Sequence, residues 1–244
     1  EALVRAHLRR GEVHRHLVDS VTMALAARGV KVHVLGHPVI QIRRDRAGRL
    51  QAVGQGETES VMHLEIDRQT SDGMAAIESA LLSVLEDVRA IVRDWPQMRR
   101  RMQEVADGLA TRRMPLGEGE RHEAQEFLRW VADDHFTFFG YREYEVRRRG
   151  GRELLVPVKG SGLGLLRGEG DAGGRPLESL AAHRMSAQGQ AEALVLTKTN
   201  ARSTVHRPGY MDYIGVLGFD EKGRAVSEQR FLGLYTSSAY NRRP

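Results

Sequence analysis

The stretch YMDYIGVLGFDEKGRAVSEQRFLGLY, residues 210–235, is the part of the chain that most clearly decides the fold. Two runs rich in apolar residues, Tyr210–Phe219 and Ala225–Tyr235, flank the turn residues Asp220-Glu221-Lys222-Gly223. This pattern predicts two antiparallel strands joined by a short hairpin turn. Residues 193–198 are expected to add a third strand, so the end of the chain should form an antiparallel sheet.

The region before this sheet is expected to supply a helix and a second hairpin. The Pro- and Gly-rich loop Met114–Gly119 predicts a domain boundary. Beyond it, Glu120–Asp134 has the apolar spacing of a helix, and Leu154–Val158 is a candidate strand. A longer strand is predicted between them from alternating apolar residues, which are Phe136, Phe138, Tyr144 and Val146.

The first half of the chain shows a similar succession of elements. A helix is predicted from Asp19, a good N-cap, to Gly29, a good C-terminal stop. The β-branched run Val30–Arg43 predicts a strand, which a turn at 45–48 and the segment Leu50–Val53 extend into a hairpin. The alternation over Ser60–Asp67 predicts a further strand with one buried face.

A helical stripe follows, with apolar residues at alternating steps of three and four. Pro96 interrupts it, and Asp94 with Gln97 resembles a capping box that restarts the helix. We therefore expect two helices or one sharply kinked helix, with a stripe that packs on its own sheet or on another subunit. The stripe consists of Met74, Ile77, Leu81, Val84, Val88, Ile91, Trp95, Met98, Met102, Val105 and Leu109.

These elements predict an α+β fold with antiparallel sheets and helices packed on one face. We expect two modules in tandem. The first covers residues 1–113 and includes the long kinked helix, and the second covers residues 114–244.

Composition narrows the classes of function. The 244 residues include no cysteine, which excludes thiolate metal sites and disulfides. The net charge of +5 comes from arginines that are scattered among acids, so solvated faces and ion pairs are expected rather than a nucleic-acid surface. No apolar run approaches the roughly 20 residues of a membrane span, and no secretion signal is visible. A cytoplasmic protein without nucleic-acid or membrane partners is expected.

Motifs for cofactors and catalysis do not reach their usual patterns. The glycines of Gly160–Gly168 miss the G-x-G-x-x-G register, which favours a loop over a nucleotide site. His14 and His16 have no third ligand nearby in sequence, so no metal site is expected. Asp133-Asp134-His135 could pair a base with an acid, but at a helix end it is expected to bond backbone amides.

One polar segment remains as a candidate binding site. Cationic and amide groups on a loop between strands suit a small molecule that carries a carboxylate. The alternative is a network of ion pairs between domains or subunits. The candidate effector-binding residues are Lys198, Asn200, Arg202, His206, Arg207 and Tyr210.

Two segments carry a resemblance to a known family. They are Arg129–Tyr144, RWVADDHFTFFGYREY, and Lys198–Ile214, KTNARSTVHRPGYMDYI. Together with Leu17–Val21 and Arg230–Tyr240, they resemble the N-terminal region of the large bacterial NAD-specific glutamate dehydrogenases. One departure is Arg9–His16, which stands where that family has an acidic and then apolar stretch. Either the first module lacks its leading strand, or residues are missing between His14 and Leu17.

The resemblance implies two ACT-like regulatory modules, with the catalytic domain much further along a longer chain. It also implies oxidative deamination of L-glutamate to 2-oxoglutarate and ammonia, with NAD bound outside this region. A large homo-oligomer and an amino-acid effector are the implied partners. Because four well-separated lysines cannot assemble the dehydrogenase pocket, we expect no catalytic residue within this chain. The alternative is a stand-alone α+β module that senses amino acids or binds nucleic acid.

Overall fold

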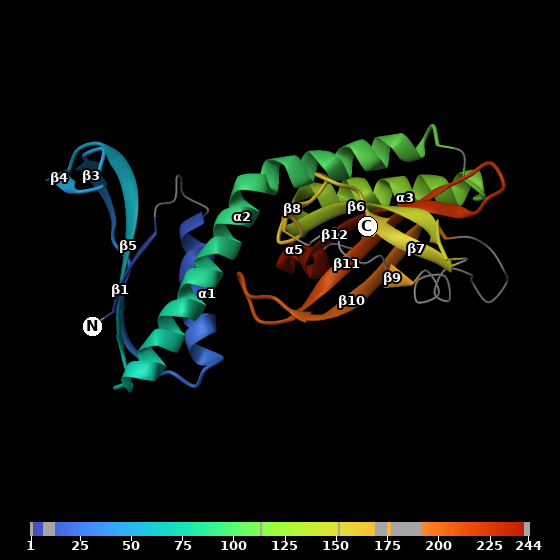
Figure 1. The fold of residues 1–244 in the computed structure, drawn as a ribbon. Helices are drawn as coiled ribbons and strands as arrows, with labels where there is room; N and C mark the ends of the chain where they lie inside the picture. Colours follow the sequence, from blue (N-terminus) through green and yellow to red (C-terminus); the bar gives the residue numbers. More distant parts are fainter. Residues whose placement is uncertain are drawn as a thin grey trace. The chain divides into compact units, whose positions relative to one another are not determined.

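The computed structural model describes residues 2–6, 13–112, 114–150, 152–168, 175–176 and 192–241. The chain divides into two compact units (Figure 1). The first comprises residues 1–89 and 202–209, and the second comprises residues 90–201 and 210–244. Each contains an antiparallel sheet with helices, so the expected α+β class is confirmed. The division into modules at residues 113 and 114 stays a prediction.

The sheet of the first unit is built around its longest strand, β5. Strand β1 pairs antiparallel with one edge of β5, and β2 and β3 follow one another along the other edge. In Figure 1, helix α1 and the first half of α2 run along the same side of this sheet. The strands are β1 (Ala2–Ala6), β2 (Val32–Gly36), β3 (Val39–Arg44), β4 (Leu50–Val53) and β5 (Glu57–Ile66).

Strand β1 excludes the alternative that the first module lacks its leading strand. It pairs with β5 in the register Ala2↔Leu64 to Ala6↔Ser60, so the first unit has a leading strand. The expected single strand over Val30–Arg43 is wrong, because the chain breaks between β2 and β3 at His37 and Pro38. Proline has no N–H to donate to a strand ladder, which explains the break. The β3–β4 hairpin is confirmed.

Helix α1 (Val13–Ala26) begins earlier than expected. Asp19 lies inside it and is not its N-cap, because the preceding turn contains no helix breaker and includes Leu17, which is only 1% exposed in the core. The C-terminal stop at Gly29 is confirmed: Gly29 has φ +71°, and the Val30 N–H donates to the Leu25 carbonyl at 3.1 Å. This hydrogen bond is typical of a Schellman motif.

Helix α2 (Ser71–Leu109) runs through Pro96 as one element. Of the two alternatives expected from the sequence, the single helix is therefore observed and the division into two helices is not. Its first half belongs to the first unit and its second half to the second. The stripe is largely buried in the chain's own cores, for example at Val88 and Met102. Packing of this kind offsets the single hydrogen bond that a proline removes from a helix.

The second unit has a larger sheet, in the order β10-β11-β12-β6-β7-β9, with β8 paired to β6. The three closing strands and their hairpin are confirmed. The strands are β6 (Phe136–Arg149), β7 (Arg152–Pro157), β8 (Leu163–Gly164), β9 (Arg175–Pro176), β10 (Leu194–Arg202), β11 (Tyr210–Phe219) and β12 (Ala225–Tyr235).

Helices cover one face of this sheet. Helix α3 (Glu118–Trp130) is followed by a π-helical turn, η1 (Val131–His135), and a short helix α5 (Ser237–Asn241) lies near the end of the chain. Helix α3 ends four residues before the predicted Asp134. Buried residues of α2 and α3, such as Met102 and Leu128, pack in one cluster with Ile214 and Phe231 of the sheet.

A bulge in β6 changes which aromatic residues face the helices. Strand β12 pairs Gly233 with Phe138 and Leu232 with Gly140, so Phe139 is an extra residue. The predicted alternation therefore holds for Phe136 and Phe138 and then shifts by one residue. Tyr141 joins the core cluster instead of Tyr144, whose ring lies 4.1 Å from the Arg230 guanidinium. A bulge of this kind reverses side-chain direction within a strand.

Across the described parts of the chain, no helix combines the length and the apolar character that crossing a membrane requires.

Candidate functional site

The loop between β10 and β11 carries two of the candidate effector-binding residues, His206 and Arg207, and Arg202 is the last residue of β10. Residues 202–209 belong to the first unit, whereas the strands on either side belong to the second. The Ser203 N–H donates to the Gly209 carbonyl at 2.8 Å and closes the loop. The Ser203 hydroxyl donates to the Val205 carbonyl at 2.6 Å, and Thr204 donates to the Asp87 carboxylate at 2.7 Å. The loop is thus tied to itself and to α2.

His206 occupies a strained position within this loop. Its φ of +73° and the hydrogen bond of 3.0 Å from the Arg207 N–H to the Val205 carbonyl define a γ-turn. The His206 N–H donates to the Ser20 hydroxyl at 3.1 Å, and its ring Nδ1 lies 2.9 Å from Nδ1 of His16. Burial, followed by the charges of His16 and Arg207, lowers the pKa of His206.

The other three candidate residues belong to the second unit. Lys198 pairs with Asp212 at 2.5 Å, where the Asp212 side chain is only 6% exposed. The other Asp212 oxygen accepts the Tyr235 N–H at 3.2 Å. Asn200 and Tyr210 are exposed. Lys198 therefore has a structural partner within the second unit, which does not test the alternative of ion pairs between domains or subunits.

The six candidates are thus divided between the units. Arg202, His206 and Arg207 are counted with the first, and Lys198, Asn200 and Tyr210 with the second. Their role in effector binding stays a prediction.

The glycine-rich segment 160–168 does not fit a dinucleotide. The Gly164 N–H donates to the Asp94 carboxylate at 2.8 Å, and Arg167 binds the same carboxylate at 2.6 Å. Gly164 has φ +57°, and a Cβ there would lie 2.2 Å from the Phe139 carbonyl oxygen. A pyrophosphate needs free N–H groups at a helix N-terminus. This turn instead contains the short strand β8, and its Gly164 N–H already donates to Asp94.

Asp94 has a structural role that sequence reasoning missed. The sequence predicts a helix cap at Asp94, but this residue lies inside α2 and is 2% exposed. Burial opposes its ionisation, yet the hydrogen bonds from Arg167 and the Gly164 N–H lower the pKa of Asp94 overall. The partners lie about 70 residues further along the chain, so local sequence gave no indication of them.

The Asp133-Asp134-His135 corner is structural as well. The His135 ring is bonded through Nδ1 to the Trp130 carbonyl at 2.8 Å and stacks on the Trp130 ring, with centroids 4.4 Å apart. Asp134 has φ +59°, and its carbonyl accepts the Thr236 hydroxyl at 3.0 Å. The corner therefore joins η1 to the end of β12. The described bond of the His135 ring is to a backbone carbonyl, and the expected bonds to backbone amides stay a prediction.

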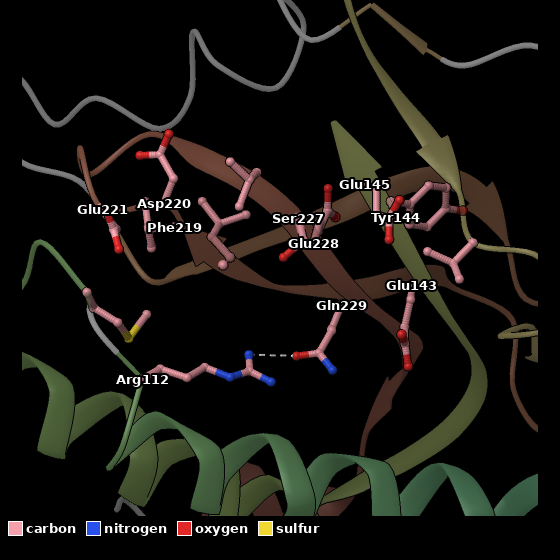
Figure 2. A pocket seen from close by; sticks show the side chains of 15 residues that line it. Arg112, Glu143, Tyr144, Glu145, Phe219, Asp220, Glu221, Ser227, Glu228 and Gln229 are labelled. Atoms are coloured by element: carbon pink, nitrogen blue, oxygen red, sulfur yellow. Dashed lines mark hydrogen bonds between the residues drawn. The ribbon is translucent and has the colours of Figure 1, made fainter. Parts of the chain in front are cut away.

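The second unit contains a pocket of about 610 Å³ that the sequence did not suggest. Figure 2 shows Arg112 reaching across it to Gln229, to which it donates at 2.9 Å. Glu143 lies beside this pair and accepts the Tyr141 hydroxyl at 2.7 Å. Burial, followed by the hydrogen bond to Glu143, raises the pKa of Tyr141.

The charge of this pocket disfavours anions. Among the described residues that line it, Arg112 is the only basic one, against five acidic residues. Glu228 is fully buried and is bonded to the Tyr213 hydroxyl and to Arg230. A carboxylate ligand would meet net negative charge here, so the pocket suits a cation better than an amino-acid carboxylate. The acidic lining residues are Glu143, Glu145, Asp220, Glu221 and Glu228.

Comparison with known proteins decides the relationship. Residues 15–81 match the family described as the ACT1 domain of glutamate dehydrogenase. The chain is 36% identical over 238 residues to an NAD-specific glutamate dehydrogenase of Halomonas elongata, covering 93% of this chain and 15% of that protein. The chain is related to the NAD-specific glutamate dehydrogenases. The resemblance expected from the sequence is therefore confirmed.

Two further glutamate dehydrogenases match over nearly the same span. The NAD-specific enzyme of Pseudomonas aeruginosa is 37% identical over 235 residues, covering 92% of this chain and 14% of that protein. The NAD-specific enzyme of Mycobacterium tuberculosis is 27% identical over 234 residues, covering 92% of this chain and 13% of that protein. The chain thus spans about one seventh of the length of the curated relatives it matches. These relatives do not favour a stand-alone sensor or a nucleic-acid-binding module.

Proposed function

We propose that this chain is the N-terminal regulatory and oligomerisation region of an NAD-dependent glutamate dehydrogenase. The similarity to the Halomonas protein, over 93% of this chain but 15% of that protein, carries the proposal. The parent enzyme would deaminate L-glutamate oxidatively to 2-oxoglutarate and ammonia in the cytoplasm. Its catalytic domain and its NAD would lie elsewhere in the same polypeptide, which would assemble as a homo-oligomer.

The arrangement of the chain supports a regulatory role. Residues 15–81 match a domain whose description carries the name ACT1, and the second unit repeats the α+β class. We propose that residues 1–113 and 114–244 are the two ACT-like modules, with α2 as the long helix of the first. Gly164 and Arg167 of the glycine segment 160–168 bind Asp94, which supports the proposal that the nucleotide binds elsewhere in the polypeptide.

We further propose the segment 198–210 as the effector-binding segment. Its two arginines, Arg202 and Arg207, and its lysine carry the positive charge that an amino-acid carboxylate requires. The pocket of the second unit is less suitable, because its lining is mainly acidic. Asn200, His206 and Tyr210 would add neutral hydrogen-bonding groups to the segment.

The proposal is tested with the full-length protein. Glutamate-dependent NADH formation is measured with a panel of amino acids, and binding of the same panel is measured by calorimetry. Some member of the panel should change the rate, and Arg207→Gln should weaken its binding at least about tenfold, as expected when a charge-assisted hydrogen bond is lost.

Lys222→Gln is the matched control, because this lysine lies in the β11–β12 turn outside the segment. It should leave effector binding unchanged. Flat isotherms for every amino acid would refute the effector role and leave assembly as the function. A full-length protein that fails to oxidise glutamate would refute the parent activity.

A further inference from the structure

Three side chains of the first unit converge although they are far apart in the sequence. His16, Asp19 and His206 each offer one metal-ligating atom, and these atoms all lie within 4.8 Å of one another. His16 and Asp19 are three residues apart on α1, which places them on the same face of the helix. The histidines are 190 residues apart, so the sequence could not suggest the group.

The geometry of the two imidazoles suits a shared ligand. Their Nδ1 atoms are 2.9 Å apart, and the rings meet edge to face at 86° with centroids 4.4 Å apart. Two nitrogens bound to one tetrahedral Zn²⁺ at 2.0–2.1 Å would be separated by about 3.3 Å. The two nitrogens would need to move apart by only a few tenths of an ångström. The Asp19 carboxylate would supply the third ligand atom. Without an ion, one ring donates a hydrogen bond to the other.

The backbone holds both histidines in place. The His206 N–H donates to the Ser20 hydroxyl at 3.1 Å, and the Ser20 hydroxyl donates to the His16 carbonyl. Ser20 is fully buried, so this connection is shielded from water. His206 also has a positive φ, a strained conformation that is frequent at ligand-binding sites. A loop that is pinned in this way positions the ring before any ligand arrives.

We propose that His16, Asp19 and His206 bind a divalent transition-metal ion, with Zn²⁺ as the best match. Two imidazole nitrogens and one carboxylate oxygen are ligands that Zn²⁺ prefers, and water would complete the tetrahedron. All three side chains are partly exposed, so an ion can enter from solvent. The positive charge of Arg207 opposes the ion, and the Asp19 carboxylate offsets it.

The ion would fasten the loop 203–209 to helix α1. In its absence the loop is held by the hydrogen bonds to Ser20 and Asp87. The inference does not depend on effector binding, which has its own calorimetric test.

The test uses the full-length protein after treatment with a chelator. Co²⁺ is titrated first, because four-coordinate Co²⁺ gives visible absorption bands that report its ligands, and Zn²⁺ is then added to displace it. The proposal predicts visible bands that saturate and disappear on addition of Zn²⁺. It also predicts that Zn²⁺ raises the thermal midpoint of the wild-type protein.

Variants assign the bands to this site. His206→Gln removes a ligand, and Asp19→Asn is a second variant on a partly exposed helix position that should keep the fold. Loss of an outer-shell partner already weakens metal binding by about 10–100-fold, so each variant should weaken it by at least about 100-fold. His63→Gln is the control, because His63 lies on β5 near Glu65, with its side chain 40% exposed.

Two results would overturn the proposal. The first is a wild-type protein in which Co²⁺ gives no bands and Zn²⁺ no thermal shift, which would leave the two rings as a hydrogen-bonded pair. The second is a metal affinity that is the same in the His206→Gln and Asp19→Asn variants as in the His63→Gln control. Weakening in both ligand variants but not in the control supports it.

Discussion

The two units share a fold class but are filled by different chemistry. Residues 1–89 contain no Phe, Tyr or Trp, and the first aromatic residue of the chain is Trp95. The first unit is packed with aliphatic side chains such as Val21 and Leu64, whereas the second packs Phe138, Tyr141 and other aromatics between its helices and its sheet. The α+β class therefore follows from the spacing of apolar residues and from the turns. It does not depend on whether the apolar residues are aliphatic or aromatic.

The difference extends to polar residues. Seven of the ten histidines belong to the first unit, including the converging pair His16 and His206. The buried ionic groups described for the second unit, Asp94 with Arg167 and Glu228 with Arg230, hold turns and strands together. The first unit also has a buried ion pair, Glu59 with Arg44. The units therefore differ in their aromatic residues and histidines and not in the presence of buried ion pairs.

The largest effect is expected from Phe138→Ala in the second unit. Phe138 is 1% exposed and packs against Phe136 and Phe231 at ring-centroid distances of 5.2 and 6.1 Å. Removing a buried phenyl ring should lower the free energy of unfolding by about 3–5 kcal/mol. Urea unfolding followed by tryptophan fluorescence measures it, because both tryptophans, Trp95 and Trp130, lie in this unit.

Tyr210→Ala is the matched control for an aromatic residue in the same unit. Tyr210 is 49% exposed, so its loss should change the free energy of unfolding by no more than about 0.5 kcal/mol. Equal effects of the two substitutions would contradict the assigned core.

A smaller loss is expected from Leu25→Ala in the first unit. Leu25 is 1% exposed, and its removal should cost about 2–4 kcal/mol, because an aliphatic side chain buries less area than an aromatic ring. Far-UV circular dichroism should detect the lower transition. Tryptophan fluorescence should change little if the units unfold separately, since the first unit has no tryptophan. Coincident shifts in both probes would show that the two units unfold together.

Asp94→Asn should cost about 1–3 kcal/mol, because Arg167 and the Gly164 N–H lose a charged acceptor. The lowered pKa of Asp94 means that the folded state binds its proton less readily than the unfolded state does. Its contribution is therefore complete above the ordinary aspartate pKa near 3.8 and is lost as pH falls through the lower folded value. Denaturant unfolding at several acidic pH values should show a difference between wild type and variant that narrows with acid. A constant difference would contradict the assigned ionisation.

The smallest effect is expected on the surface of α2. Arg101 donates to Glu104 at 2.9 Å, and both side chains are exposed. A double-mutant cycle with Arg101→Ala and Glu104→Ala should give a coupling of about 0.2–0.5 kcal/mol that falls with added salt. A coupling above about 1 kcal/mol would show that this surface is less solvated than the structure indicates.

Much of the fold was predictable from local sequence. The hairpin at 220–223 and the stop at Gly29 follow from turn chemistry, which acts over a few residues. Pro96 left one helix or two as alternatives, and the buried stripe around it explains why α2 is a single helix. The β6 bulge at Phe139 could not be predicted, since it depends on the register of β12.

The candidate site was less predictable than the fold. Sequence reasoning chose Lys198 for its charge but could not see that Asp212 accepts it. It also excluded a metal site by searching for ligands near His16 in the sequence, whereas His206 approaches His16 only in the folded chain. The side chain of His14 lies outside the described residues. Long-range convergence of polar groups is a property of the tertiary structure.

We propose that this chain regulates or assembles a dehydrogenase without performing its reaction. The most direct measurement compares NADH formation from L-glutamate and NAD by purified residues 1–244 and by the full-length protein, after circular dichroism has verified that residues 1–244 are folded. We predict glutamate-dependent NADH formation by the full-length protein and none by residues 1–244. NADH formation by residues 1–244 alone would contradict the account.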